Sequence, residues 1–422
     1  MRVVQRQAGD AVAVSPSPRL GIRHMNMVAI IIFNMPTYGH MTKEASAADH
    51  AVPAAHDVPA PRGPGHAATS YLPVWSPRPR SRRKAVITLV VTVGGLVVLL
   101  VVASSAAVAL GPVSIPAGDV VAILAERLGL PMGEPAARQE LVVGEIRLPR
   151  VLVAVLVGAA LGTAGAVMQA LFGNPLAEPG VTGVSAGAAV GAVLAITAGA
   201  GGTLVLPAAS FAGALLTVGA VCGIAAASRG RGMATVLLVG IALNALLGAV
   251  VSALVANAPD EQSLRGIVFW LQGDLDARTW EHVRLTVVPV LAGVAAAMVF
   301  SRDLNVMMLG DDAARTSGVD VARTRNVLLA LASLLTGMAV AVSGVIGFVG
   351  LVAPHVVRLI TGPDHRLLLP ASALLGAVFL VSADTAARLL PASVTLQTGV
   401  VTAVVGAPVF LLLVLWSRRR IS

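Results

Sequence analysis

Charged side chains are rare in the long apolar stretches of this sequence, so the few that occur there are candidates for chemistry. Asp384 and Arg388 are four residues apart, and on a helix they would lie on one face and neutralise each other as an ion pair. His355 and Arg358 are three residues apart near the end of another stretch, where an arginine usually extends its head group to the membrane surface. Charges inside a membrane often mark function, but both pairs are interpreted here as structural.

The other intramembrane polar residues do not assemble into a reactive site. Gln169 and Asn244 are expected to bridge neighbouring helices. The only cysteine, Cys222, excludes an internal disulfide and a cysteine-built zinc site, and neither lysine, Lys43 or Lys84, follows a glycine as a phosphate-binding loop requires. The sequence has no HExxH pair and no chain of buried Asp, Glu or His residues, which disfavours a metalloprotease and a proton-coupled carrier. We predict no catalytic residue, metal or cofactor on this chain.

The composition places the chain in a membrane. Of the 422 residues, 56% are hydrophobic and only 12% are charged, and the mean hydropathy of +0.84 is too high for an ordinary soluble domain. A membrane span needs about 20 apolar residues, and the rest of the chain is filled by stretches of this kind that contain no Asp, Glu, Lys or Arg. These stretches are residues 85–118, 151–177, 179–228, 232–259, 285–301, 326–357, 367–383 and 389–417.

Two of these stretches are expected to hold two helices each. Residues 179–228 are interrupted by a glycine-rich turn at Gly199–Gly202, and residues 326–357 contain Ser343, Gly344 and Gly347 near their middle. The total is then ten helices, with 16 Lys and Arg residues in the inner segments against eight in the outer ones, as the cytoplasmic preference of basic residues requires. We predict an all-α polytopic membrane protein with ten transmembrane helices and both termini in the cytoplasm.

The N-terminal 84 residues differ from the remainder of the chain. They contain 11 Lys and Arg against four Asp and Glu, they are rich in Pro, Ala and Arg, and they have almost no aromatic residues, which predicts disorder. Translation from a later methionine such as Met41 would leave the helical region intact, so a misplaced start codon is one explanation of this tail. Residues 85–417 are predicted to form the transmembrane domain, and residues 418–422 a basic cytoplasmic C-terminus.

The predicted inner loop at residues 302–325 is long enough to hold a helix of its own. Asp311 or Asp312 can cap such a helix, the alanines that follow favour it, and Gly318 can end it. A short helix outside the membrane could be a plain connector or a lever pressed by a soluble partner, and the residues alone leave both open.

Several short motifs share the order and spacing of one transporter family. They are RLPR at 147–150, NPLAEP at 174–179, GVSAGA at 183–188, LGD at 309–311, GFVGLVAPHVVR at 347–358, AD at 383–384 with Arg388, and GAP at 406–408. Together they resemble the FecCD-type permeases, which are the transmembrane subunits of iron–siderophore and cobalamin importers with ATP-binding cassettes (ABC importers). The resemblance covers about residues 85–417 and implies the fold of a type II ABC importer permease.

The resemblance implies a transport subunit of a bacterial cytoplasmic membrane and not an enzyme. Its partners would be a second copy or close paralogue, two cytoplasmic ATPase subunits that hold the ATP and magnesium, an extracytoplasmic binding protein and the lipid bilayer, with no nucleic acid. The leading cargo is an iron–siderophore-type chelate, with cobalamin, haem or a free metal ion as alternatives. An ATPase-independent secondary carrier is a further alternative, whereas a receptor or enzyme would need a sensor domain or reactive cluster that the sequence lacks.

The resemblance also implies roles for single residues. Arg147, Arg150 and Arg388 match arginines that meet acidic residues of the binding protein, and the ten-helix topology places all three on the outer side. Asn174 and Leu176 match residues near the cytoplasmic gate. The helix that would couple the permease to the ATPase contains Asp311, Asp312, Ala313, Ala314, Arg315 and Gly318.

One segment departs from the family pattern. Before the last span the family usually has an acidic residue, a leucine and a proline, whereas this chain has Thr395, Leu396 and Gln397. The change removes a local acidic partner for Arg388, and loss of the proline is expected to loosen the outer turn.

Overall fold

The computed structural model describes residues 82–418 except 112, 114, 128, 131–135, 201, 228–232 and 391–395. The predicted disordered tail lies outside these residues up to residue 81, as do Thr395 and the predicted C-terminus beyond residue 418. Every regular element in the described part of the chain is helical. The all-α prediction is therefore confirmed for these residues.

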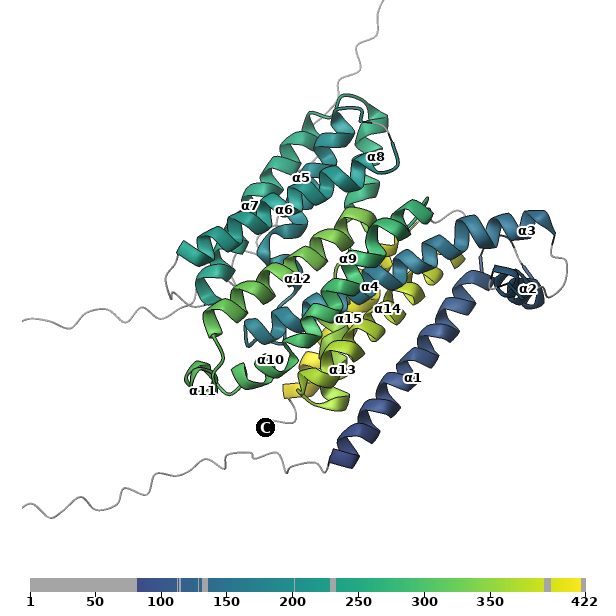
Figure 1. Cartoon of the computed structure of the whole chain (residues 1–422). Coiled ribbons are helices and arrows are strands. Elements are labelled where there is room, and N and C mark those ends of the chain that lie inside the picture. Colours follow the sequence, from purple (N-terminus) through teal and green to yellow (C-terminus); the bar gives the residue numbers. More distant parts are fainter. Residues whose placement is uncertain are drawn as a thin grey trace, which may run out of the picture. The chain divides into compact units, whose positions relative to one another are not determined.

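The elements follow one another in the order shown in Figure 1. They are α1 (Arg82–Ala109), α2 (Ala117–Arg127), α3 (Ala137–Leu141), the π-helical turn η1 (Val142–Arg147), α4 (Leu148–Leu171), the 3-10 turn η2 (Pro179–Thr182), α5 (Val184–Thr197), α6 (Val205–Ala227), α7 (Met233–Ala256), α8 (Glu261–Leu271), α9 (Trp280–Val299), α10 (Ser301–Met307), α11 (Asp311–Thr316), α12 (Val321–Ser343), α13 (Val349–Thr361), α14 (His365–Leu389) and α15 (Thr398–Arg418).

Seven helical segments in the described chain are long and apolar enough to cross a membrane: α1, the continuous run from α3 to α4, α6, α7, α9, α12 and α14. Three more, α5, α13 and most of α15, are apolar but shorter. The predicted division of residues 179–228 into α5 and α6, and of 326–357 into α12 and α13, is confirmed. The ten-helix topology and the cytoplasmic location of the termini stay predictions.

Helix α4 lies at the centre of the bundle, between α12 and α14 in Figure 1. Its most apolar 18-residue window is 83% buried. Small residues allow this packing: a Cβ atom built on Gly158 would lie 2.4 Å from the carbonyl oxygen of Gly376 in α14, and one on Gly162 would lie 2.2 Å from that of Ser372. Close backbone approach at small residues is how helices associate in lipid.

Two segments that the sequence assigned to outer loops are helical. The RLPR motif at 147–150 belongs to the continuous α3–η1–α4 run, with Pro149 directly after the π-helical turn η1, where the helical hydrogen-bond pattern changes. Helix α8 begins after Asp260, whose carboxylate accepts a hydrogen bond from the Ser263 backbone N–H at 2.7 Å. Both were missed because charged residues interrupt the apolar pattern used to find spans.

Candidate functional site

Two interruptions of helical structure meet beside the middle of α4. The first, residues 172–183, joins α4 to α5 and contains η2, and the second, residues 344–348, joins α12 to α13. Gly350 of α13 contacts both the first interruption and α4. A Cβ atom built on Gly350 would lie 2.8 Å from the ring of Pro179 and 2.9 Å from the carbonyl oxygen of Leu161, which is near the middle of α4. We call these two segments the helix breaks.

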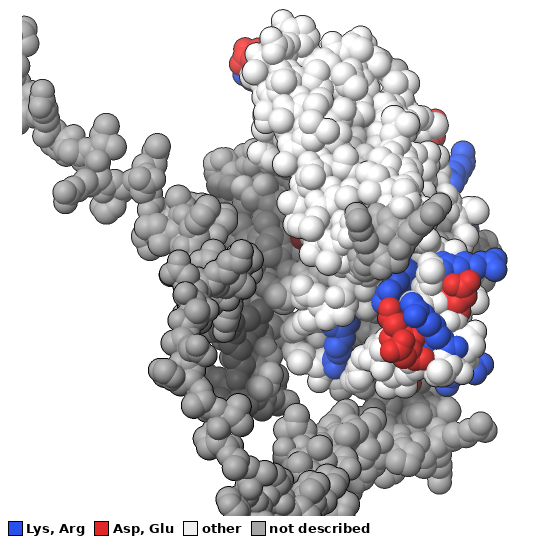
Figure 2. Space-filling model, turned by 90° about the vertical axis from the view of Figure 1, so that its left-hand side faces the viewer, with Lys and Arg blue, Asp and Glu red and all other residues white. Residues whose placement is uncertain are grey.

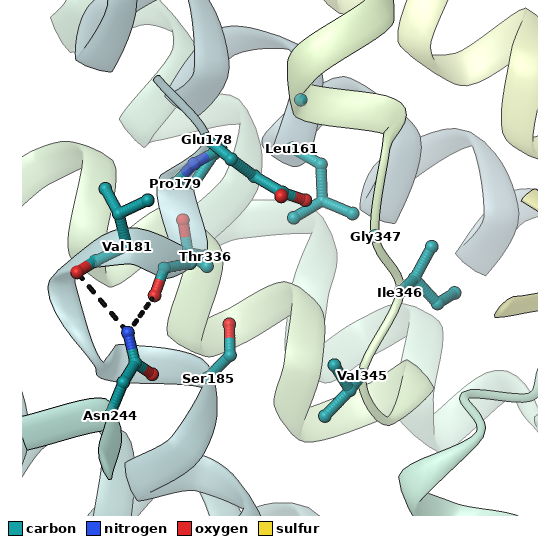
Figure 3. A pocket seen from close by; sticks show the side chains of 12 residues that line it. Leu161, Glu178, Pro179, Val181, Ser185, Asn244, Thr336, Val345, Ile346 and Gly347 are labelled. Atoms are coloured by element: carbon teal, nitrogen blue, oxygen red, sulfur yellow. Dashed lines mark hydrogen bonds between the residues drawn. The ribbon is translucent and has the colours of Figure 1, made fainter. Parts of the chain in front are cut away.

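A cavity of about 340 Å³ lies between the helix breaks (Figure 3). Four of its lining side chains are polar, namely Glu178, Ser185, Asn244 and Thr336. The remaining lining residues are Leu161, Pro179, Gly180, Val181, Val345, Ile346, Gly347 and Gly350. Two non-helical segments of an apolar helical bundle thus line one cavity, which is the candidate functional site.

The Glu178 carboxylate connects the two helix breaks directly. Its Oε1 accepts a hydrogen bond from the backbone N–H of Phe348 at 3.1 Å. Phe348 immediately precedes α13 and has a left-handed backbone conformation with φ of +68°, which is uncommon for a residue with a side chain. The first N–H groups of a helix have no partner within the helix, so Glu178 satisfies one of them from another segment. In the sequence, Glu178 is part of the NPLAEP motif, which does not by itself indicate a role for this carboxylate.

Asn244 of α7 forms hydrogen bonds with the first helix break. Its side-chain amide donates to the carbonyl oxygens of Gly180 at 3.1 Å and Val181 at 3.4 Å, as the dashed lines in Figure 3 show. Gln169 of α4 similarly donates to the carbonyl oxygen of Leu351 in α13 at 3.2 Å. The prediction that Gln169 and Asn244 bridge neighbouring segments is confirmed.

The two predicted gate residues lie in the first helix break, outside the lining of the cavity. The Asn174 side-chain oxygen accepts a hydrogen bond from the Leu176 N–H at 2.9 Å, which closes a tight turn. Leu176 is 47% exposed. The turn thus presents an apolar side chain on the same segment that carries Glu178, and the gate function stays a prediction.

Arg150 of α4 and the pair of Asp384 and Arg388 of α14 form a charged cluster that joins the two helices. We call these three residues the arginine cluster. Asp384 is buried and accepts hydrogen bonds from Arg150 Nη2 at 2.8 Å, Arg388 Nε at 3.1 Å and Thr398 Oγ1 at 3.0 Å. A further nitrogen of Arg150 contacts Asp276, whose side chain is largely exposed. The predicted pair of Asp384 and Arg388 is confirmed, and Arg150 and Thr398 complete its surroundings.

Arg147 is also engaged within the protein. Its guanidinium donates to the carbonyl oxygens of Val108 at 2.7 Å, Ala109 at 2.8 Å and Val113, and the residue is buried. The last carbonyls of a helix lack partners and carry partial negative charge, so an arginine at the end of α1 stabilises them. Arg150 and Arg388 therefore meet at Asp384, whereas Arg147 binds backbone carbonyl oxygens near the end of α1. The docking role of all three arginines stays a prediction.

The loop between α8 and α9 adds acidic residues that the sequence analysis did not single out. Asp274 lies 3.8 Å from Arg150, and its backbone oxygen accepts a hydrogen bond from Arg278 at 3.3 Å. Burial raises the pKa of Asp274 above its ordinary value, and the charge of Arg150 opposes that rise. Burial also lowers the pKa of Arg278. The sequence did contain a signal for these residues, because Asp274 and Asp276 follow closely after an apolar segment.

Helix α11 confirms the predicted short helix in the inner loop, and Gly318, with φ of +85°, follows its end as predicted. The predicted capping by Asp311 or Asp312 is wrong. The residue before the helix is Gly310, and Asp311 instead accepts two hydrogen bonds from Arg325 of α12, at 2.7 and 3.0 Å. The pairing is bidentate and charged, and it occupies both carboxylate oxygens of Asp311.

The remaining residues of α11 divide between packing and exposure. Ala314 is buried and Ala313 is half-buried, whereas Asp312 and Arg315 are exposed and 3.9 Å apart. Leu309, two residues before the helix begins at Asp311, is 76% exposed. Figure 2 shows charged side chains gathered in one region of a face that is otherwise mostly uncharged, at the end of the bundle where α10 and α11 lie.

His355 and Arg358 lie on α13, away from the cavity. His355 is buried with its ring centroid 6.3 Å from that of Phe410 in an edge-to-face arrangement, and neither ring nitrogen has a hydrogen-bond partner. Arg358 is half-buried in the last turn of α13, as expected for an arginine that reaches toward a membrane surface.

A family model describing the FecCD transport family matches residues 96–416, which is more than half of the chain. The chain belongs to the FecCD transport family. The matched range contains both helix breaks, the arginine cluster and α11.

Relatives support this membership. The chain is 47% identical over 284 residues to the cobalamin import system permease protein BtuC of Halobacterium salinarum, covering 67% of this chain and 76% of that protein. It is 42% identical over 282 residues to the hemin transport system permease protein HmuU of Yersinia pestis, covering 66% of this chain and 84% of that protein. A solved inward-facing structure, assigned to the metal-chelate type of ABC transporter, matches with a TM-score of 0.68 and 32% identity, covering 76% of this chain and 98% of the other.

Proposed function

We propose that this FecCD-family chain is the permease subunit of an ABC importer that moves a metal chelate into the cytoplasm. The observation that carries the proposal is the pair of helix breaks around a cavity beside the middle of α4, in a chain whose family is one of transport. Ligand pathways in membrane transporters are formed by interrupted helices of this kind. In this proposal the chain has no catalytic role, and a partner ATPase binds the ATP and magnesium.

The proposed topology has ten transmembrane helices with both termini in the bacterial cytoplasm. Seven long and three shorter apolar segments support that number. A second copy or close paralogue would cover α7, whose most apolar window is only 11% buried in this single chain. Because α7 also carries Asn244, such a dimer would place the cavities of the two subunits near a shared central pathway.

The proposed partners bind at opposite ends of the bundle. Helix α11 would be the coupling helix, because it exposes Asp312 and Arg315 while Arg325 fixes its start. Arg150 and Arg388 of the arginine cluster would face acidic residues of the binding protein, with Arg147 behind them. Exposed charge pairs across such a surface contribute orientation and encounter rate more than affinity.

The proposed cargo is a metal chelate carried as an intact complex. An iron–siderophore-type chelate follows from the resemblance, and the names of the two relatives add cobalamin and hemin as alternatives. The cavity supports a chelate over a free metal ion, because its lining offers one carboxylate and otherwise amide, hydroxyl and apolar groups. In the described residues there is no group of three or more His, Cys, Asp or Glu side chains that could hold a metal.

The test is uptake into proteoliposomes that contain the chain with its ATPase and binding protein. The probes are radiolabelled cobalamin, haemin and a ferric hydroxamate siderophore, each with ATP and with a non-hydrolysable analogue. ATP-dependent uptake of one chelate is expected. Uptake that continues without the ATPase would replace the proposal with a secondary carrier, and transport of free metal ions in place of chelates would overturn the cargo class.

A further inference from the structure

Glu178 is the only ionisable side chain among the residues that line the cavity. It belongs to the first helix break, and its hydrogen bond reaches across to Phe348 in the second. Figure 3 shows its side chain extending from the segment before η2 toward Leu161 and Gly347. A single side chain therefore connects the two interrupted regions that surround the cavity.

The physical setting makes this hydrogen bond strong. The N–H of Phe348 stands at the start of the 13-residue helix α13, where unpaired donors and the helix dipole give a positive potential. A carboxylate acceptor at that position forms a charge-assisted bond. If the carboxylate is removed, the N–H is left without its partner in a region lined by Leu161, Val345 and Ile346.

The first helix break is also fixed to α7. Asn244 donates to Gly180 and Val181, and a Cβ atom built on Gly240 would lie 2.3 Å from the Val181 carbonyl oxygen, so η2 and α7 are in close contact. Any movement of α7 relative to α13 must then act on η2. At α7 the link consists of two hydrogen bonds beside the contact at Gly240, whereas at α13 it consists of one hydrogen bond, from Phe348 to the rotatable side chain of Glu178, beside the contact of Gly350 with Pro179.

We propose that Glu178 is a positioning residue for transport, whose hydrogen bond to Phe348 holds the two helix breaks together and restricts access to the cavity until cargo passes. This inference rests on the proposed transport function, because the opening of the cavity has a role only if cargo passes through it. The restricted access is a property of this chain and can be measured without cargo or ATPase.

The experiment measures the accessibility of the cavity to a thiol reagent. The parent is the full chain with Cys222→Ala and Ile346→Cys, because Cys222 is the only native cysteine and Ile346 is a buried residue of the lining. Membrane vesicles of both orientations are treated with a membrane-impermeant methanethiosulfonate, and the labelling rate is followed. Glu178→Ala is expected to raise the rate roughly tenfold or more from one face, because the part-buried hydrogen bond between the helix breaks is lost.

Two controls separate a latch from general loosening of the fold. A reporter at Ser372→Cys, buried between α4 and α14, must stay slow in the Glu178→Ala chain. The exposed acid Glu281, replaced by alanine, must leave labelling of I346C unchanged. If Glu178→Ala does not accumulate in the membrane, Glu178→Gln serves in its place, because it keeps an acceptor oxygen and is expected to give a smaller increase in the same direction.

Equal labelling of I346C with and without the Glu178 carboxylate would overturn the proposal. A parallel rise at S372C would overturn it too, because Glu178 would then stabilise the bundle as a whole. Failure of the transport function is separate: it would show as no ATP-dependent uptake by the unmodified chain, while the accessibility result could still stand.

Discussion

The cavity between the helix breaks and the arginine cluster hold their buried polar groups in opposite ways. In the cavity a single carboxylate, Glu178, accepts from a backbone N–H, and neutral groups make the other contacts. In the cluster, Asp384 is 1% exposed and lies between the guanidinium groups of Arg150 and Arg388. The first arrangement can exchange partners at moderate cost, whereas the second cannot lose a member without leaving a buried charge. The difference marks the cavity as the region able to rearrange and the cluster as a fixed anchor.

The largest expected effect comes from breaking the anchor. Asp384→Ala leaves Arg150 and Arg388 without their shared acceptor, and loss of one partner of a buried ion pair costs about 3–5 kcal/mol. We expect the purified chain to lose most of its thermal stability or to fail to accumulate. Asp276→Asn, at the exposed contact of Arg150, is the matched control and should change the unfolding temperature little. Equal stability of the two variants would contradict the anchor.

A second test addresses the packing that brings the helix breaks together. A Cβ atom on Gly165 would lie 1.8 Å from the carbonyl oxygen of Gly350, so Gly165→Ala must push α4 and α13 apart, with an expected cost of about 1–3 kcal/mol. Gly219 in α6 has no atom near an added Cβ, and Gly219→Ala should be neutral or slightly stabilising. The measurement is thermal unfolding of both variants in detergent. A neutral Gly165→Ala would show that the close contact is not needed.

A third test asks whether α11 contacts a partner. Ala313→Arg adds bulk and charge beside the pair of Asp311 and Arg325, and we expect the bound ATPase recovered with the chain to fall about tenfold, as at an interface hot spot. Gln262→Arg, on exposed α8 at the other end of the bundle, is the control and should retain the ATPase. Normal recovery with Ala313→Arg would make α11 a plain connector.

The smallest expected effect concerns the exposed edge of the arginine cluster. Asp276 occupies one nitrogen of Arg150, so Asp276→Asn frees that nitrogen for an acid of the binding protein. We expect docking to strengthen by about two- to fivefold at low salt, and the gain to vanish at high salt because exposed pairs are screened. Glu281→Gln makes the same change in net charge and should give less. Docking that is unchanged by Asp276→Asn at low salt would argue against Arg150 as a contact.

The sequence predicted the elements where the pattern was local. Asp384 and Arg388 are one helical turn apart, and the glycines near 200 and 344 interrupt apolar runs, so both the pair and the helix divisions could be predicted. Arg150 could not be assigned to Asp384, because the two are 234 residues apart and meet only after α4 packs on α14.

The cavity was beyond sequence reasoning for the same reason. Glu178 and Phe348 are 170 residues apart, and their contact depends on two interrupted helices meeting beside α4. The capping prediction for Asp311 failed because Gly310 holds the capping position and the Asp311 carboxylate pairs with Arg325, 14 residues away in α12. The local signal for a short helix was correct, but the ion pair with the next helix decided the partner of Asp311.

The most direct test of the central claim is the composition of the complex that the full chain forms in its native membrane. The tagged chain is extracted in mild detergent, its partners are identified by mass spectrometry, and the mass of the assembly is measured. The account predicts two copies of the permease with two copies of an ATPase that carries a phosphate-binding loop. Recovery of the chain alone, or without any nucleotide-binding partner, would contradict it.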